Sequence, residues 1–265
     1  MTRTRIAISI AAVAFAASAV SLAFLAQGAQ AATTVNSGDL VRGTSFSAVY
    51  YVGADGFRYV FPNDKAYFTW YSNFNTVKTI SDAELAKIQI GGNVTYKPGV
   101  RMVKINTDPK TYAIDENSTL RHVTSEAVAI ALYGADWNKK IDDIADGFFS
   151  NYTIGEAIED TGDYNVTTAM ENASSINNDR NLVAPKVINI GTDGFSPLDV
   201  TISEGQVVKF INNTSAPHSV TADDFSWGSG TMNNGETFTK RFTEEGIYSF
   251  YDGYDSSNSG AIYVE

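Results

Sequence analysis

Residues 204–213, Glu-Gly-Gln-Val-Val-Lys-Phe-Ile-Asn-Asn, decide the fold of the C-terminal part of this chain. A short apolar segment lies between Glu-Gly and Asn-Asn, which are turn-forming pairs, so the pattern predicts a β-strand over 206–212. Six further strands are predicted on either side of it, at 186–190, 200–203, 218–222, 237–242, 247–251 and 260–264. Their number and spacing are typical of an all-β Greek-key sandwich over 186–265.

Particular strings in this segment resemble the cupredoxins, the blue-copper family that includes plastocyanin and azurin. They are Phe195-Ser-Pro197, residues 204–213, Ala216-Pro-His218-Ser-Val, Asn234-Gly-Glu236 and Phe242-Thr-Glu-Glu-Gly246. The resemblance implies a cupredoxin-like sandwich with copper ligands at one end. It places the first copper histidine at His218, the cysteine at Asp252, the second histidine at Asp255 and the methionine at Asn258.

The chain contains no cysteine, and a type 1 copper centre requires a thiolate sulfur. The resemblance therefore implies a domain whose copper ligands are largely lost. Two interpretations of the remaining positions stay open. His218, Asp252 and Asp255 could converge as an imidazole and two carboxylates, a set that suits a divalent ion such as zinc, manganese or copper(II). Alternatively, these aspartates are only turn-forming residues, and the domain has no cofactor.

The N-terminus has the features of a secretory signal. Arg3 and Arg5 precede an apolar run over 6–25, and Ala29-Gln-Ala31 is a small-residue cleavage site, so we expect a signal peptide over 1–31. An uncleaved membrane anchor is the alternative, because such a run can just span a bilayer. We expect the protein to be extracellular or attached to the cell surface or envelope.

The charge balance limits the classes of partner. Removing Arg3 and Arg5 from 19 basic residues leaves 17 against 30 acidic ones, a net charge of −13. Such an acidic chain disfavours nucleic acid and anionic lipid as partners. We expect contact with a membrane only through an uncleaved signal segment. A cell-envelope protein or a cell-wall polymer is a compatible partner.

The segment 46–158 contains two related halves, which predict a duplicated α+β domain with units at about 46–95 and 108–158. An offset of 63 aligns Tyr51 with Ile114, Arg58 with Arg121 and Phe74 with Trp137. An offset of 64 then aligns Val77 with Ile141 and Asp82 with Asp146. Each unit is expected to be a β-hairpin followed by short helices. Helix starts are expected at residues 62–64, at Ser81 and at residues 124–126; the helix after Ser81 is expected over 82–88, and Gly134 is expected at a helix end.

These halves also resemble uncharacterised repeats of bacterial surface proteins. The resemblance rests on residues 57–63, Phe-Arg-Tyr-Val-Phe-Pro-Asn, on residues 104–112, Lys-Ile-Asn-Thr-Asp-Pro-Lys-Thr-Tyr, and on residues 132–137, Leu-Tyr-Gly-Ala-Asp-Trp. It implies a cell-envelope context and no catalytic activity. Residues 159–185, rich in Asn, Thr, Ser and Asp, are predicted to be an exposed polar linker that could include a short helix around residues 167–173. An ordered segment packed on one domain is the alternative.

Enzyme motifs are missing from the sequence, which has two histidines, no cysteine nucleophile, no Gly-x-Ser-x-Gly elbow and no phosphate-binding loop. We therefore expect an exported, non-catalytic surface protein whose cupredoxin-like domain is a binding or structural module. The alternative is a metal-binding cupredoxin-like protein related to electron-transfer proteins. Two aromatic groups are candidate binding surfaces, although strand alternation buries about half of such rings. They are Tyr248, Phe250, Tyr251, Tyr254 and Trp227, and Trp70, Tyr71 and Phe74.

Overall fold

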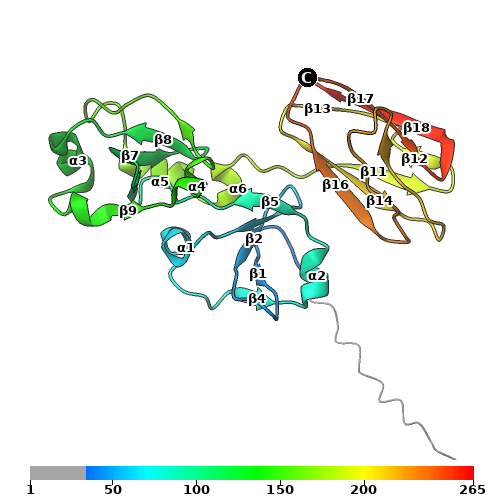
Figure 1. Ribbon diagram of the computed structural model, residues 1–265, viewed down its shortest axis with the longest axis horizontal. Helices are drawn as coiled ribbons and strands as arrows, with labels where there is room; N and C mark the ends of the chain where they lie inside the picture. Colours follow the sequence, from blue (N-terminus) through cyan, green and yellow to red (C-terminus); the bar gives the residue numbers. More distant parts are fainter. Residues whose placement is uncertain (1–33) are drawn as a thin grey trace, which may run out of the picture. The chain divides into compact units, whose positions relative to one another are not determined.

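The computed structural model describes residues 34–265, and the predicted signal peptide lies outside the described residues. The described chain forms four β-sheets with six short α-helices and one 3-10 helix (Figure 1). No helix in this part of the chain has the length and apolar character needed to cross a membrane.

The first sheet has the strand order β4-β1-β2-β3-β5. Strands β1–β2 and β2–β3 are antiparallel, whereas β1–β4 and β3–β5 are parallel. Helix α1 connects β3 to β4, and helix α2 connects β4 to β5. The elements are β1 Leu40–Arg42, β2 Tyr50–Val52, β3 Arg58–Val60, α1 Asp64–Trp70, β4 Val77–Thr79, α2 Asp82–Ala86 and β5 Ile90–Asn93.

The second sheet repeats this plan, with the order β9-β6-β7-β8-β10. Again the first three strands pair antiparallel, and the two outer strands pair parallel to their neighbours. The elements are β6 Met102–Ile105, β7 Asp108–Asp115, β8 Thr119–His122, α3 Glu126–Tyr133, η1 Trp137–Lys140, β9 Ile141–Asp143, α4 Asp146–Phe149 and β10 Thr153–Ile154. The first strand of each sheet precedes the expected unit boundary at 46 or 108.

Cross-strand partners relate the two sheets at an offset of 62 in their first three strands. Leu40 lies opposite Tyr51 in one sheet, and Met102 lies opposite Ala113 in the other. The expected offset of 63 is wrong here: the counterpart of Tyr51 is Ala113, and that of Tyr59 is Arg121. A one-residue error in the alignment assigns every side chain of a strand to the opposite face of the sheet.

After the first α-helix of each half the offset is 64, as the sequence predicted. Ile80 N–H donates to the Arg42 carbonyl, and Ile144 N–H donates to the Lys104 carbonyl. The change from 62 to 64 has two local causes. Helix α3 has eight residues where α1 has seven, and the connection that follows α3, over 134–140, is one residue longer than the one over 71–76.

The predicted helix starts are confirmed. Asn63 accepts from Ala66 N–H at the start of α1, and Ser125 accepts from Val128 N–H at the start of α3. Ser81 and Glu84 form a reciprocal capping box on α2. Gly134 ends α3 with φ +85°, which a residue without a side chain adopts at low cost. Helix α2 ends at Ala86, before the expected Ile88.

Residues 159–185 contain two helices where the sequence predicted an exposed linker. They are α5 Val166–Asn172 and α6 Ile176–Asp179. Tyr164 and Ala169 are buried in the core of the second sheet, and Ile176 is buried in the core of the first. The few apolar residues of this polar segment thus lie where they can be covered, which composition alone does not show.

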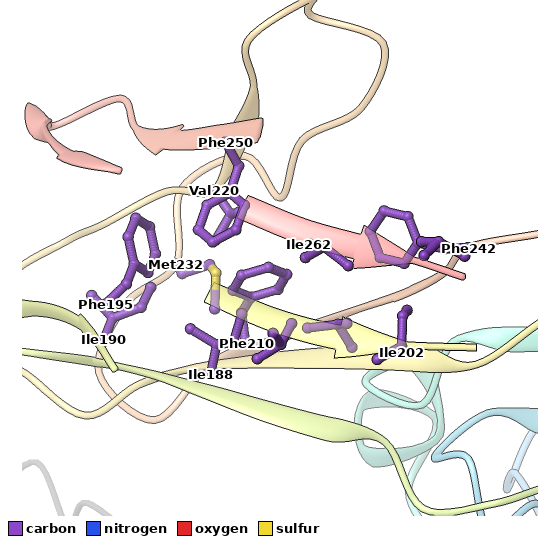
Figure 2. Packing of buried hydrophobic residues seen from close by; sticks show 13 residues of the cluster. Ile188, Ile190, Phe195, Ile202, Phe210, Val220, Met232, Phe242, Phe250 and Ile262 are labelled. Atoms are coloured by element: carbon purple, nitrogen blue, oxygen red, sulfur yellow. The ribbon is translucent and has the colours of Figure 1, made fainter. Parts of the chain in front are cut away.

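The last part of the chain packs two four-stranded sheets, ordered β12-β11-β14-β16 and β13-β18-β17-β15, into a sandwich. Its interior is a single apolar cluster, in which Phe195, Phe210 and Phe250 point toward one another (Figure 2). The strands are β11 Lys186–Gly191, β12 Gly194–Ser196, β13 Asp199–Ile202, β14 Val207–Asn212, β15 Thr221–Ala222, β16 Thr237–Arg241, β17 Gly246–Asp252 and β18 Asp255–Val264.

Three strands differ from expectation at one end of this sandwich. Strand β15 has two residues rather than the five predicted from His218, β12 was not predicted, and β18 begins at Asp255 rather than Gly260. As a result β17 and β18 form a tight hairpin in which Asp252 pairs with Asp255. The expected ligand loop is largely strand, with an irregular register after Tyr251.

Candidate functional site

His218 lies in the segment between β14 and β15 and is held there by its own backbone. Its N–H donates to the Met232 carbonyl at 3.1 Å, and its carbonyl accepts from Met232 N–H at 2.8 Å. The ring is mostly covered, with 16% of the side chain exposed, and its Nδ1 lies 2.6 Å from Asp252 Oδ2. The backbone thus presents the imidazole to the β17–β18 hairpin.

Asp252 ends β17 and is fully buried. Its Oδ2 contacts His218, and its Oδ1 accepts from Ser219 N–H at 2.9 Å and from Tyr254 N–H at 3.0 Å. A buried carboxylate is stable only when its oxygens are hydrogen-bonded. Here both oxygens are used, and the bonds tie the His218 segment to the hairpin turn. The turn-forming interpretation of Asp252 is therefore incomplete.

Asp255, in contrast, is exposed and bonds locally. Its Oδ1 accepts from Ser257 Oγ at 2.6 Å and from Ser257 N–H at 3.1 Å. These two bonds, the side-chain bond first, hold the pKa of Asp255 below its usual value, and the nearby His218 ring adds to the effect.

The structure brings His218 and Asp252 into direct contact but does not add Asp255 to a three-ligand set. Over residues 34–265 no group of three or more His, Cys, Asp or Glu side chains is placed to hold a metal ion. Asn258, at the position of the family's methionine, accepts from Phe195 N–H at 2.9 Å and so has a structural contact.

These residues do not fit a type 1 copper ion. The cysteine position carries a carboxylate, and the chain has no cysteine that could replace it. The ring nitrogen of His218 that faces this position already contacts Asp252. The pair instead resembles the carboxylate–histidine contact found behind metal ligands and catalytic bases, where the carboxylate orients the ring and selects its tautomer.

Comparison with known proteins finds cupredoxins that are similar to part of this chain. A plastocyanin major isoform, chloroplastic, from Arabidopsis thaliana is 35% identical over an alignment of 99 residues, and the match covers 31% of this chain and 59% of that protein. The chain thus spans 59% of the length of this curated relative. About a third of the chain is cupredoxin-like. No family model matches the sequence.

Two solved structures match a similar share of the chain. A purple cupredoxin from Nitrosopumilus maritimus is 28% identical, with a TM-score of 0.28, and the match covers 30% of this chain and 99% of that one. An amicyanin mutant in its Cu(I) form is 22% identical, with a TM-score of 0.29, and the match covers 31% of this chain and 82% of that one.

The predicted aromatic surfaces are mostly core. Phe250 is fully buried, and Tyr248 and Trp227 pack against the same cluster. Tyr254 remains 54% exposed, and its hydroxyl lies 2.8 Å from Thr231 Oγ1. In the first unit Phe74 is 48% exposed.

Sequence reasoning missed the burial of three aspartates outside the sandwich turn, Asp55, Asp142 and Asp179. Asp55 accepts from Tyr59 Oη at 2.5 Å and pairs with Arg241. Asp179 is 2% exposed and has no partner for either carboxylate oxygen among the described residues. Burial raises the pKa of Asp179 to about 7. Aspartates in polar stretches give no sequence signal for such burial, because turn chemistry favours the same residue.

Proposed function

We propose that this chain is an exported, non-catalytic protein of the cell envelope or cell surface, and that its cupredoxin-like domain is a binding or structural module without a type 1 copper site. The observation that carries the proposal is the burial of Asp252 at the position assigned to the copper cysteine. Its contacts to His218, Ser219 and Tyr254 hold the His218 segment to the β17–β18 hairpin. In a metal-containing site the bound ion provides this link.

The absence of a placed nucleophile supports the non-catalytic part of the proposal. A buried aspartate that orients a histidine also occurs in catalytic triads. Among residues 34–265, however, the His218 ring has its hydrogen bond to Asp252, and no serine, threonine or tyrosine hydroxyl bonds to the ring as an activated nucleophile would. The carboxylate and imidazole are therefore better explained as a structural pair.

The N-terminal part is proposed to be a duplicated module. Its two sheets share strand order, strand direction and helix position. Equivalent backbone hydrogen bonds support common descent. Val94 N–H donates to the Val60 carbonyl, and Ile158 N–H donates to the His122 carbonyl. The two acceptors are related by the offset of 62 and the two donors by the offset of 64. Repeats that resemble those of bacterial surface proteins favour an envelope location and a binding role.

Two measurements test this proposal. Titration of the purified protein with copper(II) is expected to produce no intense blue absorption, because that band requires a thiolate ligand. Fractionation of the native host, followed by a pull-down against cell-wall polymers and envelope proteins, is expected to find the protein outside the cytoplasm and bound to one of them. A cytoplasmic location with no envelope ligand would contradict the proposal.

One observation favours metal binding as a second candidate. The Nδ1–carboxylate contact of His218 leaves its Nε2 as the nitrogen that could bind an ion, with Asp252 orienting the ring and Asp255 nearby. Calorimetry with zinc, manganese and copper(II) on the wild type and on His218→Ala tests it. Heat that disappears in the variant would support this candidate, and no heat in either protein would exclude it.

A further inference from the structure

Each half of the N-terminal part contains a groove, and the two grooves lie at equivalent positions. The first is lined by residues 47–49, 60–64, 67 and 74, together with Asn93 and Phe148. The second is lined by residues 109–111, 122–126, 129 and 137. Every residue that lines the second groove has a counterpart in the first, at the strand offset of 62, or of 63 for Trp137 and Phe74. The fold therefore forms the same concavity twice.

The two grooves share two chemical features. Each has a partly exposed aromatic residue at the equivalent position, Phe74 in the first and Trp137 in the second, and the first is also lined by the partly exposed Phe148. Each also has an exposed carboxylate at the first residue of its helix, Asp64 on α1 and Glu126 on α3. An aromatic ring beside a hydrogen-bond acceptor forms a small amphipathic site.

Phe74 in the first groove is held in place by packing. The ring of Phe74 stacks on that of Tyr67 at 4.3 Å between centroids, yet 48% of Phe74 remains exposed. Tyr67 itself is buried and donates its hydroxyl hydrogen to the Asn73 carbonyl. A solvent-exposed ring on a fixed support loses little conformational freedom when it binds a ligand. This groove has a volume of about 640 Å³ and the second about 230 Å³.

We propose that the two grooves bind successive segments of one neutral polysaccharide, with the apolar face of a sugar ring against Phe74 in the first and against Trp137 in the second. This inference rests on the proposed binding role and specifies its ligand class. Sugar hydroxyls would donate to Asp64 and Glu126, the carboxylates that the grooves share. Two like sites suit a ligand that itself repeats, because a second contact on the same chain is gained at high effective concentration.

Charge selects a neutral polymer over an anionic one. The chain carries a net charge of −11 at neutral pH before any cleavage, and each groove presents a carboxylate. An anionic glycan would be repelled by the net charge of the chain and by Asp64 in the first groove, whose lining includes no basic residue. In the second groove the exposed Lys110 offsets the charge of Glu126. Hydroxyl groups meet no such penalty, and they satisfy a carboxylate with charge-assisted hydrogen bonds.

The test is binding of neutral oligosaccharides of increasing length to the full secreted chain, measured by calorimetry. A short oligosaccharide is expected to bind at two sites, and a long one more tightly. Phe74→Ala and Trp137→Ala should each leave one site for the short ligand and weaken the long ligand by about tenfold or more, since avidity is lost. The double variant should bind neither ligand.

Controls separate the grooves from general effects. Phe225→Ala removes a ring that is 76% exposed in the sandwich, outside both grooves, and should leave binding unchanged. Because Phe74→Ala also removes packing on Tyr67, Ser47→Trp serves as a second variant that obstructs the first groove from an exposed position. It should abolish the same site while the circular dichroism spectrum is preserved.

Each contrary result has a distinct meaning. If the wild type binds no neutral oligosaccharide at millimolar concentration, or prefers an acidic glycan or a peptide, the inference is overturned. Polysaccharide binding that survives in the double variant would overturn the role of the grooves while leaving the proposed binding function intact. A cytoplasmic location of the native protein would contradict the proposed function even if the grooves bind sugars.

Discussion

At the residue scale, three aspartates of similar sequence context have different environments. Asp252 is buried and fully hydrogen-bonded, Asp255 is exposed and bonded to Ser257, and Asp179 is buried with no partner among the described residues for either side-chain oxygen. Burial costs a carboxylate free energy unless hydrogen bonds replace its water. The three side chains should therefore differ in their effects on stability.

Replacing Asp252 with alanine should strongly destabilise the sandwich. The change leaves Ser219 N–H, Tyr254 N–H and the His218 ring without their partner in a covered site. We expect a loss of about 3 kcal/mol in the free energy of unfolding, measured by urea titration. Asp255→Ala is the matched control and should change it by no more than about 0.5 kcal/mol. Equal effects would contradict the structural role of Asp252.

Asp179 should make the protein less stable as the pH rises. Its pKa is about 7 in the folded chain, chiefly through burial, against 3.8 for an ordinary aspartate. Between these values the folded chain keeps a proton that the unfolded chain has released, so stability falls from about pH 4 to about pH 7. At 1.36 kcal/mol per unit, the loss is at most about 4 kcal/mol.

Asp179→Asn should remove this loss, so that the variant is more stable than the wild type at pH 8 and similar to it at pH 4. The free energy of unfolding at the two pH values measures the effect. Asp163→Asn is an opposite control, because backbone N–H groups of Asp160 and Glu159 lower the pKa of Asp163. The Asp163→Asn variant should be less stable than the wild type at neutral pH. A pH profile of Asp179→Asn parallel to the wild type would rule out a buried, protonated Asp179.

At the scale of elements, strand β18 is shaped by a neighbouring backbone. It pairs with β17 on one side and with β13 on the other. A Cβ atom on Gly260 would lie 2.1 Å from the Leu198 carbonyl oxygen and 2.8 Å from the Phe250 ring. Glycine is therefore required where the chain entering β13 passes closest to β18.

Gly260→Ala should lower the free energy of unfolding by about 2 kcal/mol or more, since backbone cannot yield as a flexible side chain can. Thermal unfolding followed by near-ultraviolet circular dichroism reports on this core. Gly147→Ala is a suitable comparison, because Gly147 lies in α4 with nothing within 4 Å of an added Cβ. That variant should be neutral or slightly more stable. A tolerated Gly260→Ala would show that β13 can move away.

At the scale of the whole molecule, residues 159–182 contribute to two cores. Tyr164 donates to the Ile114 carbonyl at 2.7 Å and packs with the second sheet. Ile176 and Leu182 pack with the first. The segment therefore connects the cores of the two sheets through its own buried side chains, which a solvated linker cannot do.

Limited proteolysis should accordingly spare residues 159–182. Cleavage needs local unfolding, and that is costly where side chains are buried. We expect the first cuts to fall at residues 183–185, which precede strand β11 and include the exposed Val183 and Ala184, and mass spectrometry of the fragments would locate them. Early cleavage between Glu159 and Leu182 would instead favour the flexible linker that composition predicts. Ile176→Ala should shift the first cuts into this segment.

Much of the fold could be predicted because its signals are local. Helix caps such as Ser81 and Ser125 act within one turn, and apolar alternation with turn residues places most strands of the sandwich. The offset between the two halves of 46–158 could not be read in the same way. Side-chain similarity aligned Tyr51 with Ile114, and only the pairing of strands showed that Ala113 is its counterpart.

The sequence by itself determined that this chain cannot form a type 1 copper centre, since a missing sulfur ligand needs no coordinates to establish. It also determined the cupredoxin-like pattern and the acidic charge. Only the tertiary structure decided that Asp252 is buried against His218, that Asp255 stands apart and that two equivalent grooves exist. Burial and convergence depend on contacts between residues distant in sequence, which composition and spacing do not encode.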